Sequence, residues 1–390
     1  MKKITVVAVF IFLFVFVQSS NVDIEIQVAD QVVGSGFTMP FSNRGQDVPP
    51  PFGEAARAAR AATASGATAA ERGFSIDGQK AAVLASQVNP SGNKCLSPRS
   101  VFTAYGIYVG WDAAANSDVV LTGDQSQFLH VHFIDVGQGD ATFVDFGDFE
   151  ALIDGGGKQY GQAVVNYIKP YVDGNLDLVI ASHMHGDHIG GLPAVLGAFS
   201  VSRLIDSGDT ADTEIYREYQ AAASGEEGCI YTGDENMVIA VGGELSLRII
   251  DIADGQSNAN NNSVVTQIDY HNVSILLTGD IQSAAEQMGL KYFRQADVLK
   301  AAHHGSKTSS TSDFLNVVQP RTVIISAGIN NPNNHPHWRV LQRFAKIGAK
   351  VYGTFRSGTI VLTTNGLGYC LDTDVLLTEM DAGARAQPAG

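Results

Sequence analysis

The feature that most constrains this chain is an apolar run that leads directly into a cluster of histidines. Residues 178–191 read LVIASHMHGDHIGG, which places three histidines and one aspartate within six residues. Imidazole and carboxylate groups are the usual protein ligands of zinc and of related ions such as manganese. His183 and His185 alternate, so their rings point to one side of an extended chain. A turn can then direct Asp187 and His188 to a second ion. The segment therefore predicts a strand that ends in a metal site.

Two later segments repeat this arrangement of an apolar run followed by polar residues. Residues 273–280 read VSILLTGD, and residues 296–306 read ADVLKAAHHGS. The Asp280 carboxylate has enough lone pairs to bridge two cations, although it could instead cap a following helix. Adjacent histidines on extended backbone face opposite ways, so we expect only one of His303 and His304 to bind metal. The other could donate a proton or stabilise charge.

A fourth group of histidines follows in residues 333–338, which read NNHPHW. His335 is expected at the rim of the site as an acid or a substrate contact, with a purely structural role as the alternative. His337 is expected to cap the helix that begins near Trp338. This segment adds candidates for substrate contact rather than metal ligands.

Short runs rich in β-branched and aromatic residues alternate with helical segments from residue 128 onward. Strands are predicted at 129–135, 141–146, 151–154, 176–182, 247–252, 264–270, 273–278, 322–326, 350–354 and 359–363. Helices are predicted at 162–172, 189–199, 283–293, 312–318 and 338–348. Many strands with helices between them indicate an α/β protein rather than an all-β sandwich.

The amino-terminal third differs in texture from the rest of the chain. Residues 1–20 resemble a secretory signal peptide, because Lys2 and Lys3 precede an apolar run of about 21 Å in helical length, short for a membrane span. An uncleaved membrane anchor is the alternative. Residues 21–127 are interpreted as a linker or accessory region, 128–375 as the main domain and 376–390 as a tail. We expect a secreted protein without a membrane channel.

Charge limits the partners that this chain can hold. It carries 40 acidic and 25 basic side chains, a net charge of −15. Residues 128–375 contain 28 of the acidic and 15 of the basic side chains. This balance argues against a broad basic surface for nucleic acid, although Lys307 and Arg356 could offset it locally. Three cysteines are too few for a disulfide scaffold and leave the pairing undetermined.

The order of these motifs resembles that of the metallo-β-lactamase-fold hydrolases. More narrowly, residues 130–365 resemble the metallo-β-lactamase-like domain of ComEC-type DNA-uptake competence proteins. The stretches that carry this resemblance are 133–140, 152–156, 182–191, 260–263, 277–280, 303–306 and 335–337. The resemblance implies an αββα sandwich with metals at the strand ends between two sheets.

The resemblance also implies a role for each site residue. The implied metal ligands are His183 and His185 for one ion, Asp187, His188 and His304 for the other, and Asp280 as the bridge. Asp135 and Asp140 would form a loop beside the site, and Asp154 would anchor the ligand loop. The chain departs from many relatives of this fold because residues 260–262, including Asn262, stand where a further histidine is usual. It also has His185 where competence-type domains often have aspartate.

These patterns together predict a secreted hydrolase that uses a hydroxide activated by two divalent metal ions, zinc or alternatively manganese. Phosphoesters are the favoured substrates, which makes the chain a nuclease or phosphodiesterase that grips its substrate locally at the metals. Asp187, His303 and His335 are the predicted catalytic residues. The alternatives are an amide, lactone or thioester hydrolase of the same fold, and an exported metal-binding protein without catalytic activity.

Overall fold

The computed structural model describes residues 125–225, 230–232, 237–250, 252, 258–373 and 377, and upstream of them only strand segments. The chain divides into two compact units, the first made mostly of residues 1–110 and 115–122. The upstream strands are β1 (Lys2–Ala8), β2 (Val22–Val28), β3 (Phe37–Met39), β4 (Gly73–Ile76), β5 (Gln79–Ala81), β6 (Tyr108–Asp112) and β7 (Ser117–Leu121). The rest of the predicted signal peptide, of the 21–127 region and of the tail lies outside the described residues, and these assignments stay predictions.

The second unit contains two mixed sheets. One has the strand order β13-β12-β11-β10-β9-β8-β21-β22, and the other has the order β14-β15-β16-β17-β18-β19-β20. The first sheet comprises β8 (Leu129–Phe133), β9 (Thr142–Phe146), β10 (Phe149–Ile153), β11 (Leu178–Ala181), β12 (Leu204–Asp206), β13 (Ile230–Thr232), β21 (Ile360–Thr364) and β22 (Tyr369–Leu371). The second comprises β14 (Val238–Val241), β15 (Leu245–Ile250), β16 (Val265–Tyr270), β17 (Val273–Leu277), β18 (Val298–Lys300), β19 (Thr322–Ile325) and β20 (Lys350–Gly353).

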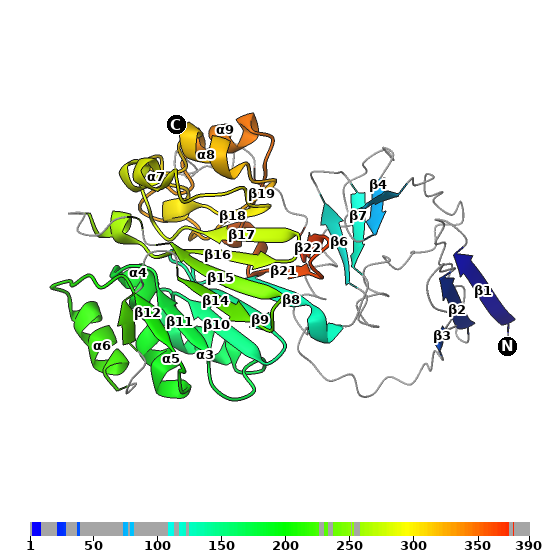
Figure 1. The fold of residues 1–390 in the computed structure, drawn as a ribbon, viewed down its shortest axis with the longest axis horizontal. Coiled ribbons are helices and arrows are strands. Elements are labelled where there is room, and N and C mark those ends of the chain that lie inside the picture. Colours follow the sequence, from blue (N-terminus) through cyan, green and yellow to red (C-terminus); the bar gives the residue numbers. More distant parts are fainter. Residues whose placement is uncertain are drawn as a thin grey trace, which may run out of the picture. The chain divides into compact units, whose positions relative to one another are not determined.

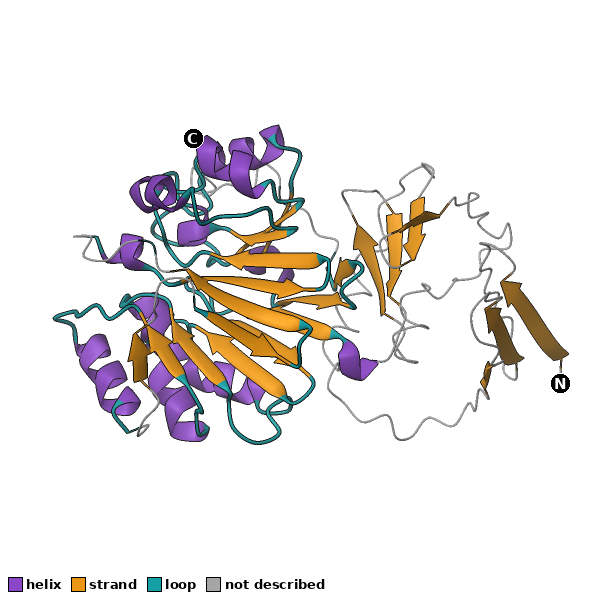
Figure 2. Ribbon diagram, in the orientation of Figure 1, coloured by secondary structure: helices purple, strands orange, loops and turns teal. Residues whose placement is uncertain are grey.

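Helices cover the outer faces of both sheets (Figures 1 and 2). On one side lie α3 (Gly161–Ile168), α5 (Leu192–Ala198) and α6 (Glu214–Ala223), and on the other α7 (Ser283–Gly289), α8 (Ser312–Val318) and α9 (Trp338–Lys346). Short elements complete the unit: α4 (Gly186–Ile189), α10 (Thr354–Ser357), η1 (Gln125–Gln127), η2 (Lys158–Tyr160), η3 (Ala259–Asn262) and η4 (Ala302–Gly305). This layering confirms the predicted αββα sandwich.

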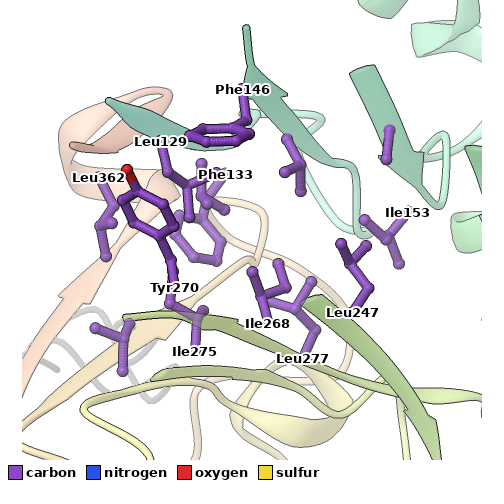
Figure 3. Packing of buried hydrophobic residues seen from close by; sticks show 14 of the residues in the cluster. Leu129, Phe133, Phe146, Ile153, Leu247, Ile268, Tyr270, Ile275, Leu277 and Leu362 are labelled. Atoms are coloured by element: carbon purple, nitrogen blue, oxygen red, sulfur yellow. The ribbon is translucent and has the colours of Figure 1, made fainter. Parts of the chain in front are cut away.

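Apolar side chains fill the space between the sheets. The fully buried side chains there include Val131, Phe133, Leu247, Ile268 and Leu362. Figure 3 shows Phe133 and Leu362 from one sheet pointing toward Leu247 and Ile268 from the other. Strands β10, β11 and β19 are buried along their whole length. Helices cover their outer faces, which explains why β11, with the sequence LVIA, reads as an unbroken apolar run rather than an alternating one.

Parallel pairing brings the polar strand ends together. In one sheet β10, β11 and β12 run parallel, and in the other β17, β18, β19 and β20 do so. The carboxyl ends of parallel strands meet at the same edge of a sheet, which is where the histidine and aspartate motifs follow. No helix in the described part of the chain is long and apolar enough to cross a membrane.

The structure corrects several predicted elements. The predicted helix 189–199 is found as α5, which begins only at Leu192, with a proline in its first turn where proline is tolerated, and Ile189 instead ends the short α4. Helix 162–172 ends at Ile168, two residues before Pro170, since proline disrupts a helix interior. Strands β12, β13, β14, β18 and β22 and helix α6 were not among the predicted elements. Four of these strands have only three residues, too few for a periodic signal.

Candidate metal centre

Asp280 lies at the centre of the candidate site, immediately after β17 and the Thr278-Gly279 pair. Its Oδ2 atom is the common neighbour of four imidazole Nε2 atoms, at 3.3 Å from His188, 3.4 Å from His304, 3.8 Å from His303 and 3.9 Å from His183. The carboxylate side chain is only 3% exposed. One buried oxygen, which itself follows β17, therefore faces ligands that follow two other strands, β11 and β18.

The backbone around Asp280 fixes this position. Gly279 has φ of +50°, and a Cβ atom there would lie 2.7 Å from the Ser263 Cβ atom. The Asp280 amide donates to Ser263 Oγ at 3.0 Å, and this hydroxyl in turn donates to the Asn260 carbonyl at 2.8 Å. The asparagine-rich η3 segment thus supports the bridging aspartate.

The remaining donor atoms form two pairs of close neighbours near Asp280. His183 Nε2 and His185 Nδ1 lie 3.0 Å apart, with their ring planes 81° from each other. In the second pair, Asp187 Oδ2 lies 3.3 Å from His304 Nε2. These are the two groups that the sequence predicts for two ions.

Asp154 holds one ligand from behind. Its Oδ2 atom accepts hydrogen bonds from His188 Nδ1 at 2.8 Å and Ser182 Oγ at 2.7 Å, and its Oδ1 atom accepts from the Ser182 amide at 2.7 Å. With Nδ1 occupied in this way, His188 presents Nε2 to Asp280. A carboxylate behind a histidine commonly fixes its tautomer and ring orientation in metal sites.

Asp140 holds a second ligand, and it brings a buried lysine with it. The Asp140 Oδ1 atom lies 3.3 Å from His304 Nδ1, which is also 3.0 Å from the Ser326 carbonyl. Its Oδ2 atom pairs with the Lys300 ammonium, and the side chains of Lys300 and Asp140 are 2% and 4% exposed. Lys300 thus neutralises a carboxylate that orients His304.

The donor set fits divalent cations. His188 Nε2, His304 Nε2 and Asp280 Oδ1 are buried atoms without a hydrogen-bond partner in the described structure. One donor atom from each of Asp140, His188, Asp280 and His304 lies within 4.8 Å of the others. Buried polar groups that lack partners are costly, and a metal ion would satisfy them. Nitrogen and oxygen ligands of this kind suit zinc or manganese.

Electrostatics in the metal-free protein also favour cation binding. Burial lowers the pKa of His183 well below its ordinary value, so this ring is neutral. Burial opposes the charge of His188 and His304, but Asp280 and a second carboxylate beside each ring raise the pKa of both histidines well above the ordinary value. Protons on these two rings thus balance the buried carboxylates when no metal does so.

Metal binding should therefore release protons. A cation must displace the protons on His188 and His304, so metal affinity should rise with pH as long as pH stays below the raised pKa values. Isothermal titration calorimetry of zinc binding at pH 7 in buffers of different ionisation enthalpy measures the released protons. We expect a release greater than one proton per chain, and no release would contradict this charge balance.

The structure corrects the prediction for the paired histidines. His303 and His304 have φ of +52° and +53°, so their backbone is left-handed rather than extended. Both rings consequently face Asp280 instead of opposite directions. His303 is partly exposed, and its Nδ1 atom lies 3.4 Å from both Gln282 Nε2 and Thr308 Oγ1. Its Nε2 atom is thus the one that faces the site.

The other predicted residues lie around this cluster or away from it. The His335 ring stands 5.4 Å from His303 and 6.2 Å from His304, at the rim. His337 caps α9 by accepting from the Arg339 amide. Asp135 is exposed and accepts a hydrogen bond from an amide of its own loop, away from the ligands. Asn262 is buried and donates to both carboxylate oxygens of Asp209 rather than facing Asp280.

Sequence reasoning missed the supporting role of Ser182, Ser263 and Lys300. Ser182 and Ser263 occur inside the motif segments, and this position in the sequence was the only indication of their role. Lys300 could have been recognised from the sequence, because it ends an otherwise apolar strand and a buried charged residue needs a partner.

The fold and the site together define a metal-dependent hydrolase with a candidate dinuclear centre. The chain belongs to the metallo-beta-lactamase superfamily, whose family model matches residues 134–329. It is 34% identical over 252 residues to ComE operon protein 3 of Bacillus subtilis, which covers 59% of this chain and 32% of that protein. Recombination protein 2 of Haemophilus influenzae is 31% identical over 234 residues, or 59% of this chain and 28% of the relative. The predicted resemblance to ComEC-type competence proteins is confirmed.

The chain spans about a third of the length of these curated relatives. Among solved structures, the metallo-beta-lactamase fold protein YhfI from Bacillus subtilis matches 60% of this chain and 100% of its own, with 14% sequence identity and a TM-score of 0.42.

Proposed function

We propose that this chain hydrolyses phosphodiesters and that its substrates are nucleic-acid strands. The observation that carries the proposal is that one oxygen, Asp280 Oδ2, is a near neighbour of rings from both predicted ligand groups, which suits a pair of cations. In a phosphodiester both the attacking and the leaving oxygen become anionic, and a two-metal site stabilises both. The name of one relative, Recombination protein 2, supports nucleic acid as the substrate.

Each ligand group has a separate task in this proposal. His183 and His185 would hold one ion, Asp187, His188 and His304 the other, and Asp280 would join them. Ions held by these residues would supply Lewis-acid chemistry, which activates water and offsets negative charge on a phosphoryl group. Asp154 and Asp140 keep the rings of His188 and His304 aligned, so the site does not reorganise during the reaction.

His303 is the side chain best placed to contact the substrate. Burial lowers its pKa, so the ring is neutral at pH 7 and acts as a hydrogen-bond donor rather than as an acid. Gln282 Nε2 can donate to Nδ1, which leaves the proton on Nε2, directed into the site. A donor aimed at developing negative charge stabilises the transition state. Burial also lowers the pKa of His335 to about 4, which makes it a neutral wall of the same pocket.

The test uses the purified full chain with Zn²⁺ or Mn²⁺. It is offered bis(p-nitrophenyl) phosphate, linear and circular DNA, a chromogenic β-lactam and a thioester. We expect turnover of the phosphodiester and of DNA. His303→Asn should lower kcat by about 100-fold without loss of bound metal. His271→Asn is the matched control, because His271 also has a left-handed backbone but is exposed on the β16–β17 turn.

Two results would count against the proposal. Absence of phosphodiester turnover with any divalent metal would reject it. Faster turnover of the β-lactam or the thioester than of the phosphodiester would assign the chain to another reaction of the same fold.

A further inference from the structure

Basic residues are concentrated in one part of the acidic domain. Residues 128–290 contain 5 Lys or Arg and 24 Asp or Glu. Residues 291–356 contain 10 Lys or Arg and only 2 Asp or Glu. The second segment includes His303, His304 and α9. The overall net charge of −15 therefore conceals a segment that carries about +8 next to the metal-binding motifs.

Three of these cations gather around one histidine. After burial, the positive charges of Lys307, Arg339 and Arg343 are what lower the pKa of His337. Arg343 Nη2 also donates to the Lys307 carbonyl at 3.2 Å. In the described structure the ion pairs of Lys and Arg involve other residues, so no carboxylate lies within 4.0 Å of these three charges. Burial lowers the pKa of Arg343 and the Glu286 carboxylate opposes this shift by acting on the same guanidinium, so Lys307 and Arg339 are the charges of this group best placed to accept an anion.

The cation group is fixed beside the metal centre by backbone contacts. The His337 amide donates to the Gly305 carbonyl at 2.9 Å, and Gly305 directly follows His304. A Cβ atom on Gly305 would lie 2.8 Å from Pro336 Cβ, so the two segments pack tightly. A ligand bound to the cations is therefore held close to the ligands of the metal ions.

An exposed aromatic ring lies in the same group. Trp338 begins α9 and is 42% exposed, unusual for so large an apolar side chain. The His337 ring lies 5.8 Å from the indole at 27°, and the Arg339 guanidinium lies 5.3 Å from its centre. The His337 ring and the Arg339 guanidinium already lie against the indole, and its exposed part can stack on a further planar group such as a base.

We propose that Trp338, Lys307 and Arg339 form a nucleotide subsite beside the metal centre, in which the indole stacks on an unpaired base and the cations bind the adjacent phosphate. The inference rests on the proposed phosphodiesterase function and names the form of substrate, a single strand with accessible bases. Stacking plus backbone charge is the general way in which proteins hold single strands without reading their sequence. An acidic domain needs such a local grip, since its other surfaces repel a polyanion.

The test compares two labelled 12-nucleotide strands with equal numbers of phosphates, an oligothymidylate and an abasic strand. Both have phosphorothioate linkages, which resist hydrolysis, and binding to the Mn²⁺-loaded full chain is measured by fluorescence anisotropy. We expect the wild type to bind the oligothymidylate about tenfold more tightly. Trp338→Ala should abolish this preference, and Trp338→Phe should keep part of it.

The cations should act on both strands alike. Lys307→Ala and Arg339→Ala should each weaken both complexes and reduce the slope of log affinity against log salt by about 0.7. Lys346→Ala, at the other end of α9, is the matched control and should change neither quantity. Circular dichroism and metal content verify that each variant is folded.

The outcomes separate this subsite from the hydrolytic activity. Equal affinity of the wild type for both strands, or an unchanged preference in Trp338→Ala, would overturn the subsite even if phosphodiesters are hydrolysed. Binding that depends on Trp338 would support it even if the chain turned over no phosphodiester, a result that would reject the proposed reaction alone.

Discussion

Asp280→Asn should abolish hydrolysis and leave the chain unable to hold two metal ions. The Oδ2 atom of Asp280 is the common neighbour of the two ligand groups, and an amide lacks the charge needed to bridge two cations. Losing several kcal/mol of transition-state stabilisation corresponds to a fall in kcat/KM of at least about a thousandfold. Elemental analysis should find at most one ion per chain, and initial rates on bis(p-nitrophenyl) phosphate measure the loss.

The matched control for this variant is Asp313→Asn, the same chemical change on an exposed residue in the first turn of α8. It should retain two ions and wild-type rates. An Asp280→Asn protein that still holds two ions and hydrolyses the diester at the wild-type rate would refute the bridging role. The negative charge of Asp280 would then be needed neither for metal binding nor for turnover.

The candidate metal ligands were predictable because each motif is local in sequence and ends a strand. His183 and Asp280 follow apolar runs, and parallel pairing brings such ends to one edge of a sheet. The αββα layering followed from the family resemblance. The longer strands were predicted with boundary errors of a few residues. Local pattern and shared topology therefore gave most of the site.

Features that depend on contacts between distant segments could not be predicted in this way. The pairing of Asp140 with Lys300 joins residues 160 positions apart. The close packing of Gly191 on Gly155 joins two segments 36 positions apart. The left-handed backbone of His303 and His304 reversed the expected direction of one ring. Histidine adopts this conformation more often than most residues, but that preference is too weak to predict it at two successive positions. In each case packing overrode the local pattern.

Lys300→Met should destabilise the metal-free protein by about 3 kcal/mol. The substitution preserves much of the apolar volume of the lysine stem, but it leaves the Asp140 carboxylate buried without its ammonium partner. Removing one member of a buried ion pair is strongly destabilising because the remaining charge stays desolvated. His304 also loses a firmly held partner, so affinity for metal should fall. Urea denaturation followed by circular dichroism gives the free energy of unfolding, and zinc titration gives the affinity.

A second substitution separates the unpaired charge from lost packing. In Lys300→Met/Asp140→Asn the remaining side chain is neutral, so the double variant should be more stable than Lys300→Met alone, although metal affinity stays low because the Asp140 carboxylate no longer faces His304. Lys350→Met, on the half-buried start of β20, should change stability by less than about 0.5 kcal/mol. If Lys300→Met proved as stable as the wild type, Asp140 would have to be protonated or paired by His304 alone. Lys300 would then have no part in holding the metal ligands.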